Sequence, residues 1–173
     1  MVNVGSGMTA QEAFDRYHRQ VFRFVCRLTR SPQTAEDVTQ ECFLAFVRAP
    51  QKYDETKGAL RAYLFAIARN LALKHYRNRG AEEQLASEAP WMAVDPRPRL
   101  EASTAVERAV AALPLLERES LILFQYEGLT LAEIAEVVGA EVGTVKGRLH
   151  RARERLRIEL APYRRVGERY GME

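Results

Sequence analysis

The chain has 173 residues, of which 47% are hydrophobic and 28% are charged, and its net charge is +3. This length accommodates one or two domains, and the apolar content excludes a chain that is disordered throughout. No segment has the charged-then-apolar pattern of a signal peptide, and no apolar run reaches the roughly 18 residues that span a membrane. We therefore expect a cytoplasmic protein without membrane insertion. The two cysteines, Cys26 and Cys42, lie among apolar residues, which favours buried free thiols over a disulfide or a redox switch.

The first predicted helix runs from the capping-box pair of Thr9 and Glu12 to about Arg30. Apolar residues recur along it at helical spacing and form one face: Phe14, Tyr17, Val21, Phe24, Val25 and Leu28. The dipeptide Ser31-Pro32 ends this helix, because a residue before proline avoids helical backbone angles. Residues 1–8 carry no periodic pattern, and we expect a frayed terminus there.

A second helix is predicted between an N-cap at Thr34 and the dipeptide Ala49-Pro50. Its buried face should comprise Val38, Cys42, Ala45 and Phe46. The other sides carry a polar, mainly acidic patch of Asp37, Gln40 and Glu41. Compensation of the helix dipole explains acids in the first turn only. The patch continues into the second turn and needs another explanation.

A polar loop over residues 52–58 leads into a long predicted helix at about 59–79. Its core stripe is Leu60, Tyr63, Leu64, Ile67, Ala68 and Leu71. On one exposed face lie Asn70, Lys74 and Arg77, and further cations and aromatic rings flank them: Arg61, Arg69, His75, Tyr76 and Arg79. Bases stack on aromatic rings and phosphates need cations, so this surface suits single-stranded or melted nucleic acid. A solvated basic helix end with Tyr76 packed inward fits the composition equally well.

Residues 80–103 break the helical pattern with Pro90, Pro96 and Pro98. Between Ala81 and Glu101, acidic residues outnumber basic ones. We interpret this stretch as a flexible acidic linker, whose charge keeps it away from phosphate-binding surfaces.

Two further helices are predicted after the linker. Thr104 is the N-cap of a short helix that turns Val106, Ala109, Val110 and Leu113 inward. The next helix, at about 115–127, should bury Leu116, Ser120, Leu123 and Phe124.

The segment 129–156 has the pattern of two helices joined by a tight turn. Gly139 ends the first of them, and the second begins near Val142 with an apolar stripe of Val145, Leu149, Ala152 and Leu156. Between Thr144 and Arg157, six residues are Lys or Arg and one is Glu. A merely solvated helix usually mixes its charges, whereas small outward side chains bordered by cations suit a helix in the major groove. We therefore predict an all-α protein of two small helical domains, 9–79 and 104–162, joined by the linker 80–103, with a DNA-binding helix-turn-helix in the second domain.

Three segments occur in a fixed order: AEDVTQECFLAF (35–46), LRAYLFAIARNLALKHYRNR (60–79) and AVAALPLLERESLILFQYEGLTLAEIAEVVGAEVGTVKGRLHRARERL (109–156). Together they resemble the bacterial RNA polymerase sigma factors of the extracytoplasmic-function (group 4) subfamily of the sigma-70 family. The resemblance covers nearly the whole chain. A helix-turn-helix alone is shared by many regulators, but the ordered combination is specific.

The resemblance implies partners for each surface. In such a protein Asp37, Gln40 and Glu41 dock on the clamp helices of the largest subunit of the RNA polymerase core. Unpaired bases of the −10 promoter element are captured by the loop from Tyr53 to Gly58 and by Asn70, Lys74 and Arg77. The duplex −35 element is contacted by Thr144, Lys146, Arg148, Arg151 and Arg155. An anti-sigma factor is a further expected partner.

Some residues depart from the pattern of this family. Tyr63 stands where Trp is common and Lys74 where Asp is frequent, while Glu141 and Gly147 replace commoner Pro or Ser and Ser. These changes alter the helix cap and the bases that can be selected, but no apolar core position.

Three alternative functions fit less well. An ordinary DNA-binding regulator would have the helix-turn-helix but would not program core polymerase. An enzyme is disfavoured because His18, His75 and His150 are far apart and no phosphate-cradling glycine loop occurs, so we expect no cofactor and no metal. An anti-sigma-like adaptor is disfavoured by the two basic faces.

Overall fold

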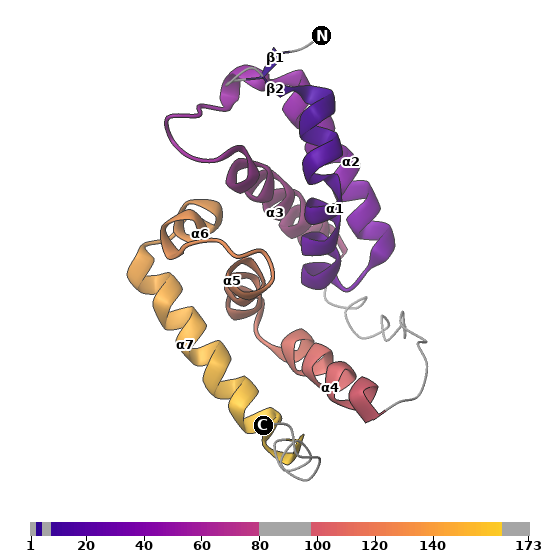
Figure 1. Ribbon diagram of the computed structural model, residues 1–173, viewed down its shortest axis with the longest axis vertical. Helices are drawn as coiled ribbons and strands as arrows, with labels where there is room; N and C mark the ends of the chain where they lie inside the picture. The colour runs from indigo at the N-terminus through magenta and orange to yellow at the C-terminus, as the bar shows by residue number, and fades with distance from the viewer. Residues whose placement is uncertain (1–2, 5–7, 80–97, 164–173) are drawn as a thin grey trace.

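The computed structural model describes residues 3–4, 8–79 and 98–163. The chain begins with the strands β1 (Asn3–Val4) and β2 (Met8–Thr9). Three helices follow, α1 (Ala10–Thr29), α2 (Pro32–Arg48) and α3 (Leu60–Arg79), and the 3₁₀ helix η1 (Pro50–Lys52) lies between α2 and α3. The last four helices are α4 (Pro98–Ala112), α5 (Leu115–Gln125), α6 (Leu131–Val138) and α7 (Val142–Glu159). The all-α prediction is confirmed (Figure 1). Among the described residues the only strands are β1 and β2, which pair antiparallel where we expected a frayed end.

Helix α1 begins and ends where the sequence predicted. The backbone N–H of Glu12 donates to the Thr9 hydroxyl, and the Glu12 carboxylate accepts from the backbone N–H of Thr9 at 2.7 Å, which completes the capping box. At the other end, Arg30 has a left-handed backbone with φ of 59° and donates its N–H to the Cys26 carbonyl. A left-handed residue commonly ends a helix in this way.

Two helices begin earlier than predicted. Helix α2 starts at Pro32, because the Ser31 hydroxyl accepts from the Thr34 backbone N–H and proline fits the first helical position. Thr34 is therefore buried in the first turn and is not the cap. Helix α4 also begins with a proline, Pro98, so that Thr104 lies within the helix and the last residues of the predicted linker are helical. The remainder of the linker, residues 80–97, lies outside the described residues.

Helices α1 to α3 pack around an aromatic and aliphatic centre, and we call them the N-terminal bundle. The rings of Phe24 and Phe65 meet edge to face with their centroids 5.1 Å apart, and Phe46 and Leu64 are fully buried beside them. Both cysteines are free and buried, as predicted, and burial raises the pKa of the Cys42 thiol to about 12. Two predicted apolar positions are wrong: Ala45 is exposed while its neighbour Phe43 is buried instead, and Phe14 of α1 is 40% exposed.

Helices α4 to α7 form the C-terminal bundle, in which α5 packs against both α6 and α7. The predicted helix-turn-helix is confirmed, with Gly139 left-handed at φ of 64° between α6 and α7. The apolar stripe of α7 faces inward, since Val145, Leu149 and Ala152 are buried. The predicted inward face of α5 is partly wrong, because Leu116 is 48% exposed.

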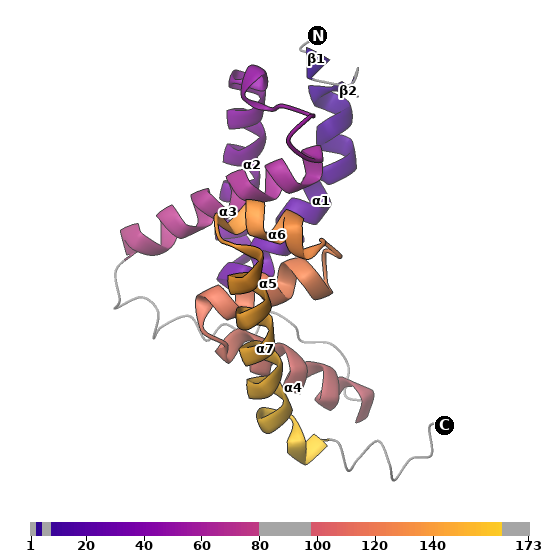
Figure 2. The ribbon, with the colours of Figure 1, turned by 90° about the vertical axis from the view of Figure 1, so that its left-hand side faces the viewer.

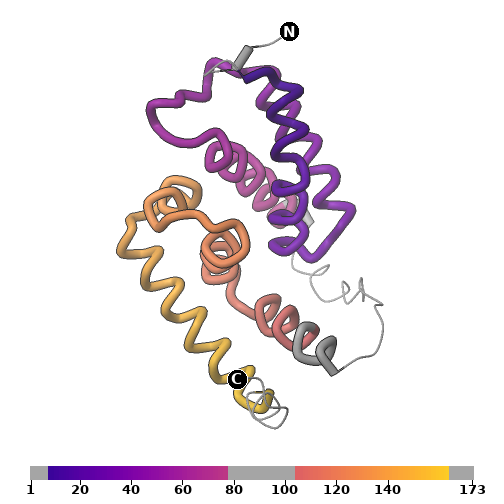
Figure 3. The backbone as a smooth tube through the Cα atoms, in the orientation of Figure 1, coloured from indigo at the N-terminus to yellow at the C-terminus, as the bar shows by residue number. Residues whose placement is uncertain are grey.

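The two bundles lie against each other. Helix α3 faces α6, and α1 faces α5, as two views at right angles show (Figures 1 and 2). In the tube representation, α5 and α6 lie along the N-terminal bundle, whereas α4 lies further from it (Figure 3). Helix α7 runs down the side away from α1 and α2. Among the described helices, none combines the length and apolar character that a bilayer-spanning segment requires.

Candidate nucleic-acid interface

The acidic patch of α2 is fully on the surface. Asp37, Gln40 and Glu41 are all exposed and follow one face of the helix, and the Glu41 carboxylate lies 3.7 Å from Nε2 of His75 on α3. The same face continues into two apolar residues, Leu44 at 51% and Val47 at 40% exposure. An acidic patch that continues into exposed apolar side chains is suited to a protein partner.

The exposed face predicted for α3 is also present. Asn70, Lys74 and Arg77 are exposed and lie along one side of the helix. The neighbouring Arg69 is largely covered, and its Nη1 donates to the Asn70 side-chain oxygen at 3.5 Å. The helix therefore offers two cations and an amide to solvent.

Tyr53, in contrast, is half-buried at the start of the loop that precedes α3. Its hydroxyl donates to the carbonyl of Gly58 at 3.1 Å, and its ring centroid lies 5.3 Å from that of Tyr63. Burial raises the pKa of the Tyr53 phenol. The ring is thus held in a fixed position and is not free to swing outward.

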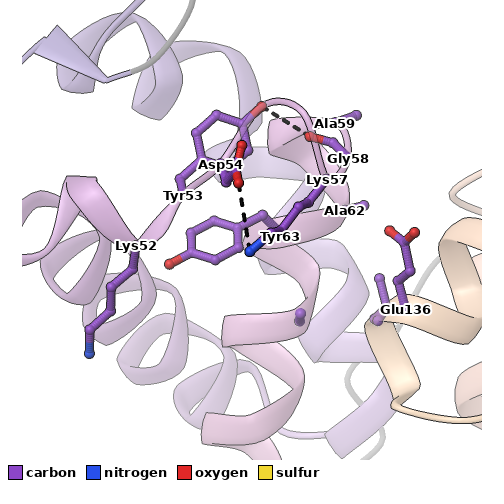
Figure 4. Close-up of a pocket in the computed structure, with 11 residues that line it drawn as sticks. Lys52, Tyr53, Asp54, Lys57, Gly58, Ala59, Ala62, Tyr63 and Glu136 are labelled. Carbon is purple, nitrogen blue, oxygen red and sulfur yellow. Dashed lines mark hydrogen bonds and ion pairs between the residues drawn. The ribbon is translucent and has the colours of Figure 1, made fainter.

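A cavity of about 220 Å³ lies beside the two tyrosines, between this loop and α6. Lys57, paired with Asp54 at 3.6 Å, borders it on the loop side (Figure 4). Glu136 and Val137 border it from α6. Most of the lining therefore belongs to the N-terminal bundle, and α6 closes one side.

The predicted residues of α7 divide into two groups. Thr144 and Lys146 are exposed near its N-terminal end. Arg151 and Arg155 are more than half exposed at their side chains, but both reach back to Glu117 of α5, at 3.1 and 3.0 Å. The guanidinium groups can still meet solvent, so this end of α7 presents a cationic surface.

Arg148 is largely buried, whereas an arginine that binds phosphate beside a recognition helix would be exposed. Only 13% of its side chain is accessible, and its Nη1 donates to Oε1 of Glu119 at 3.4 Å. Glu119 is fully buried, and it also accepts two hydrogen bonds from Arg69 of α3, at 2.7 and 3.0 Å. One carboxylate of α5 thus joins a residue of each predicted DNA-binding helix.

Sequence reasoning missed the buried acids of the C-terminal bundle. Glu117, Glu119 and Glu127 are each less than 10% exposed. Burial raises the pKa of the Glu127 carboxyl, although the positive charges of Arg27, Arg23 and Arg61 act in the opposite direction. Acidic residues at helical surface spacing carry no sequence signal that they will be buried against arginines of another helix.

No group of three or more metal-ligating side chains is found in the described part of the chain. The surfaces on α2, α3 and α7 are exposed and carry polar and charged side chains.

Comparison of the chain with known proteins shows the family to which it is similar. The family model for Sigma-70 region 2 matches residues 13–82, and that for Sigma-70, region 4, matches residues 103–156. The ECF RNA polymerase sigma factor SigE of Mycolicibacterium smegmatis is 34% identical, over 89% of this chain and 64% of SigE. SigM of Mycobacterium tuberculosis, another ECF RNA polymerase sigma factor, is 30% identical, over 88% of this chain and 77% of SigM.

A solved structure is similar across both bundles. The sigma factor RpoE from Bartonella quintana, crystallised in complex with the anti-sigma factor NepR, superimposes with a TM-score of 0.70 at 25% identity. The match covers 87% of this chain and 96% of that chain. Both bundles therefore contribute to the similarity.

Proposed function

The chain belongs to the ECF RNA polymerase sigma factors, which direct promoter-specific transcription initiation, and we propose that its two bundles divide promoter recognition between them. In this proposal residues 9–79 dock on core polymerase and bind the −10 element, residues 98–162 bind the −35 element, and residues 80–97 connect them. The observation that carries the proposal is the pair of exposed polar faces, one on α3 and one on α7, on separate bundles.

The α2 surface is the proposed polymerase-docking site. Asp37, Gln40 and Glu41 would meet basic residues of the clamp helices in the largest subunit, and Leu44 would pack at the centre of the contact. Two features support this assignment: the side chains share one face of α2, and all three are exposed while the bundles are packed together. Docking can therefore occur without any change in how the bundles are packed.

The α3 surface is the proposed site for separated strands of the −10 element. Asn70 would hydrogen-bond to an unpaired base, while Lys74 and Arg77 would neutralise phosphates. Tyr53 would act through the loop it fixes, since its hydroxyl holds Gly58 and its ring supports Tyr63. Holding bases outside the stack offsets an unpairing cost of a few kcal/mol per base.

Helix α7 is the proposed reader of the duplex −35 element. Its N-terminal residues, Thr144 and Lys146, would approach base edges in the major groove, and Arg151 and Arg155 would bind phosphates further along. The chain would act by binding alone, with the tether making the second contact effectively intramolecular once the first has formed. The similarity to RpoE bound to NepR supports an anti-sigma factor as a further partner of this chain.

Reconstituted transcription tests this division of roles. Core polymerase is combined with the protein, and initiating sequences are selected from templates randomised across both elements. We expect two conserved elements to emerge, with Asn70→Ala altering the preference at the downstream element and Lys146→Ala at the upstream one. Initiation without a sequence preference, or an effect of both variants on the same element, would refute the proposed division.

A further inference from the structure

Helix α1 and its C-cap carry a row of arginines that the proposed function does not use. Residues 16–30 contain five arginines and no Asp or Glu. The DNA-binding helix α7, in comparison, includes Glu154 among its six cations between Thr144 and Arg157. We call these five residues the α1 stripe: Arg16, Arg19, Arg23, Arg27 and Arg30.

The α1 stripe follows one side of the helix. Spacings of three and four residues place the arginines within about 80° around the helix axis, in a row roughly 21 Å long. The other side of α1 packs into the core through Val21, Phe24, Val25 and Leu28, which fixes the stripe outward. The exposed residues between positions 16 and 30 are Arg16, Arg19, Arg23 and Arg30, so every exposed side chain in this stretch is an arginine.

Little of this charge is neutralised within the described part of the chain. Arg27 pairs with Glu127 of α5 at 3.4 Å, and the charge of Arg23 also acts on Glu127. The other stripe arginines form no ion pair with a described carboxylate. Asp15, which precedes the stripe, accepts a hydrogen bond from the Gln11 amide at 3.0 Å. Like charges three and four residues apart destabilise a helix, and a bound polyanion would relieve this repulsion.

The exposed side chains of the α1 stripe indicate the class of partner. Protein interfaces have an apolar centre, which the α2 surface offers through Leu44 and Val47. Residues 16–30 expose arginines and no apolar side chain. Interfaces with nucleic acid are more polar and much more positively charged than those between proteins. The stripe therefore fits a phosphate backbone better than it fits a protein surface.

The same residues distinguish a duplex from a single strand. Proteins bind single strands through cations together with aromatic rings on which the bases stack. The rings beside the stripe, Tyr17 and Phe22, are only partly exposed, and the guanidinium carbon of Arg16 lies 5.6 Å from the centre of the Tyr17 ring. A duplex needs no stacking surface. Its major groove is about 12 Å wide, so a row of roughly 21 Å can reach phosphates on both sides of the groove.

We propose that the α1 stripe is a third DNA-binding surface, which binds phosphates of duplex DNA without reading the base sequence. Guanidinium groups bind phosphate oxygens in pairs, and phosphate contacts position a protein on DNA without specifying sequence. Arg16, Arg19, Arg23 and Arg30 are exposed while the bundles are packed together, so this binding requires no rearrangement. The duplex held by the stripe lies outside the elements assigned to α3 and α7.

Salt titration of duplex binding by the full chain tests the proposal. The probe is a labelled 20-base-pair duplex of random sequence, and fluorescence anisotropy gives its affinity at several salt concentrations. Each lost phosphate contact flattens the slope of log affinity against log salt by about 0.9. Arg16→Gln with Arg23→Gln should therefore flatten the slope by about 1.8, and Arg19→Gln alone by about 0.9. Circular dichroism should show unchanged helical content, since these side chains are exposed.

Two matched variants separate binding by the stripe from a general effect of charge. Arg16→Lys with Arg23→Lys keeps both charges on the stripe and should retain most of the wild-type slope. Arg48→Gln with Arg108→Gln removes the same charge from exposed positions on α2 and α4 and should leave the slope unchanged. A wild-type slope in Arg16→Gln with Arg23→Gln would overturn the proposal. Equal flattening by Arg48→Gln with Arg108→Gln would also overturn it, because net charge alone would then explain the result.

A single-stranded probe of the same length tests the choice of duplex. Arg16→Gln with Arg23→Gln should leave the slope for this probe unchanged, because residues 16–30 offer it no exposed ring. A change as large as that for the duplex would overturn the duplex assignment. Both probes are random in sequence, so the outcome does not depend on the proposed division of promoter elements, which the selection of initiating sequences tests separately.

Discussion

Arg151 on the exposed side of α7 is held by Glu117, a buried residue of α5, with 3.1 Å between Nε and Oε1. The other carboxylate oxygen lies 3.0 Å from Nε of Arg155, in an ion pair whose geometry does not make it a hydrogen bond. A single acid therefore holds the two arginines that are proposed to bind phosphates of the −35 element. This contact lies within the C-terminal bundle, between α5 and α7.

Glu117→Gln should lower the stability of the fold. The arginines are more than half exposed, so solvent screening limits the loss of unfolding free energy to about 1 kcal/mol. For a chain of this size, that corresponds to a decrease in melting temperature of about 2–4 °C. Thermal unfolding followed by circular dichroism measures this change. Glu154→Gln, which loses an exposed pair, should change the melting temperature less.

The docking surface leads to a prediction about association with polymerase. The double variant Asp37→Ala with Gln40→Ala should abolish binding to core polymerase, because both residues lie on the exposed face of α2. Helical content should be unchanged, since neither residue is buried. A pull-down of core polymerase measures the loss.

The matched control for this variant is Gln11→Ala with Asp15→Ala on α1. These residues are the same types, both exposed, and form a hydrogen bond of 3.0 Å with each other. The control should bind core polymerase normally. Equal binding by the two double variants would remove the docking assignment.

Lys146 and Arg148 of α7 differ in exposure, so we expect them to contribute differently to the salt dependence of DNA binding. Each phosphate contact contributes about 0.9 to the slope of log affinity against log salt concentration. Lys146 is exposed, so Lys146→Ala should flatten the slope for duplex binding by about one unit. Arg148 is largely buried against Glu119, so Arg148→Ala should flatten it by less.

Salt titrations of duplex binding compare the two variants directly. A larger change of slope for Arg148→Ala than for Lys146→Ala would show that Arg148 leaves Glu119 when DNA binds. The order of the two slopes therefore reports where the Arg148 guanidinium lies in the complex.

Local signals predicted the helices well, because capping and periodicity act within a few residues. The Thr9–Glu12 capping box, the left-handed Gly139 and the inward stripe of α7 all depend on neighbours in sequence. Helix α2 starts earlier than predicted because both Ser31 and Thr34 have a hydroxyl that can cap it, and Pro32 at the first helical position favours Ser31.

Tertiary contacts were not predictable in the same way. The burial of Glu119 depends on Arg69, which is 50 residues away, and on Arg148. Nothing in local spacing distinguishes this glutamate from an exposed one. The predicted faces on α2 and α3 are exposed together, but their roles in binding remain predictions, as does the independence of the two domains.

The left-handed residue after α1 leads to a prediction about stability. Arg30 has φ of 59°, a conformation that costs a residue with a side chain roughly 1–2 kcal/mol, part of which the greater freedom of glycine in the unfolded chain offsets. Arg30→Gly should therefore stabilise the fold by about 0.5–1 kcal/mol. Removal of its charge also relieves the buried Arg118, whose pKa is lowered chiefly by burial and further by Arg30.

The reciprocal change, Gly139→Ala, should destabilise the fold by about 1 kcal/mol. Gly139 has φ of 64°, and a Cβ there would meet no atom within 4 Å, so the cost comes from the backbone alone. Chemical denaturation of both variants measures the two changes. A loss of stability in Arg30→Gly would mean that its side chain makes a contact worth more than the backbone strain.

Glu127 makes the stability of the packed chain depend on pH. Burial raises the pKa of its carboxyl in the folded protein above the value of 4.5 for a free glutamate. Between these two values the folded protein binds more protons than the unfolded chain, so the free energy of unfolding contributed by Glu127 increases as the pH falls. In Glu127→Gln this contribution is absent.

As the pH is lowered from 7 toward 4.5, the unfolding free energy of wild type should therefore rise relative to that of Glu127→Gln. Below pH 4.5 the difference between the two proteins should become constant. Urea denaturation at a series of pH values measures it, with Glu159→Gln at the exposed end of α7 as a control for the loss of one carboxylate. A difference that changes in the opposite direction would mean that Arg27, Arg23 and Arg61 outweigh burial. In that case the contact between α1 and α5 would be strongest with Glu127 ionised, and acid would open the bundles where we expect it to hold them together.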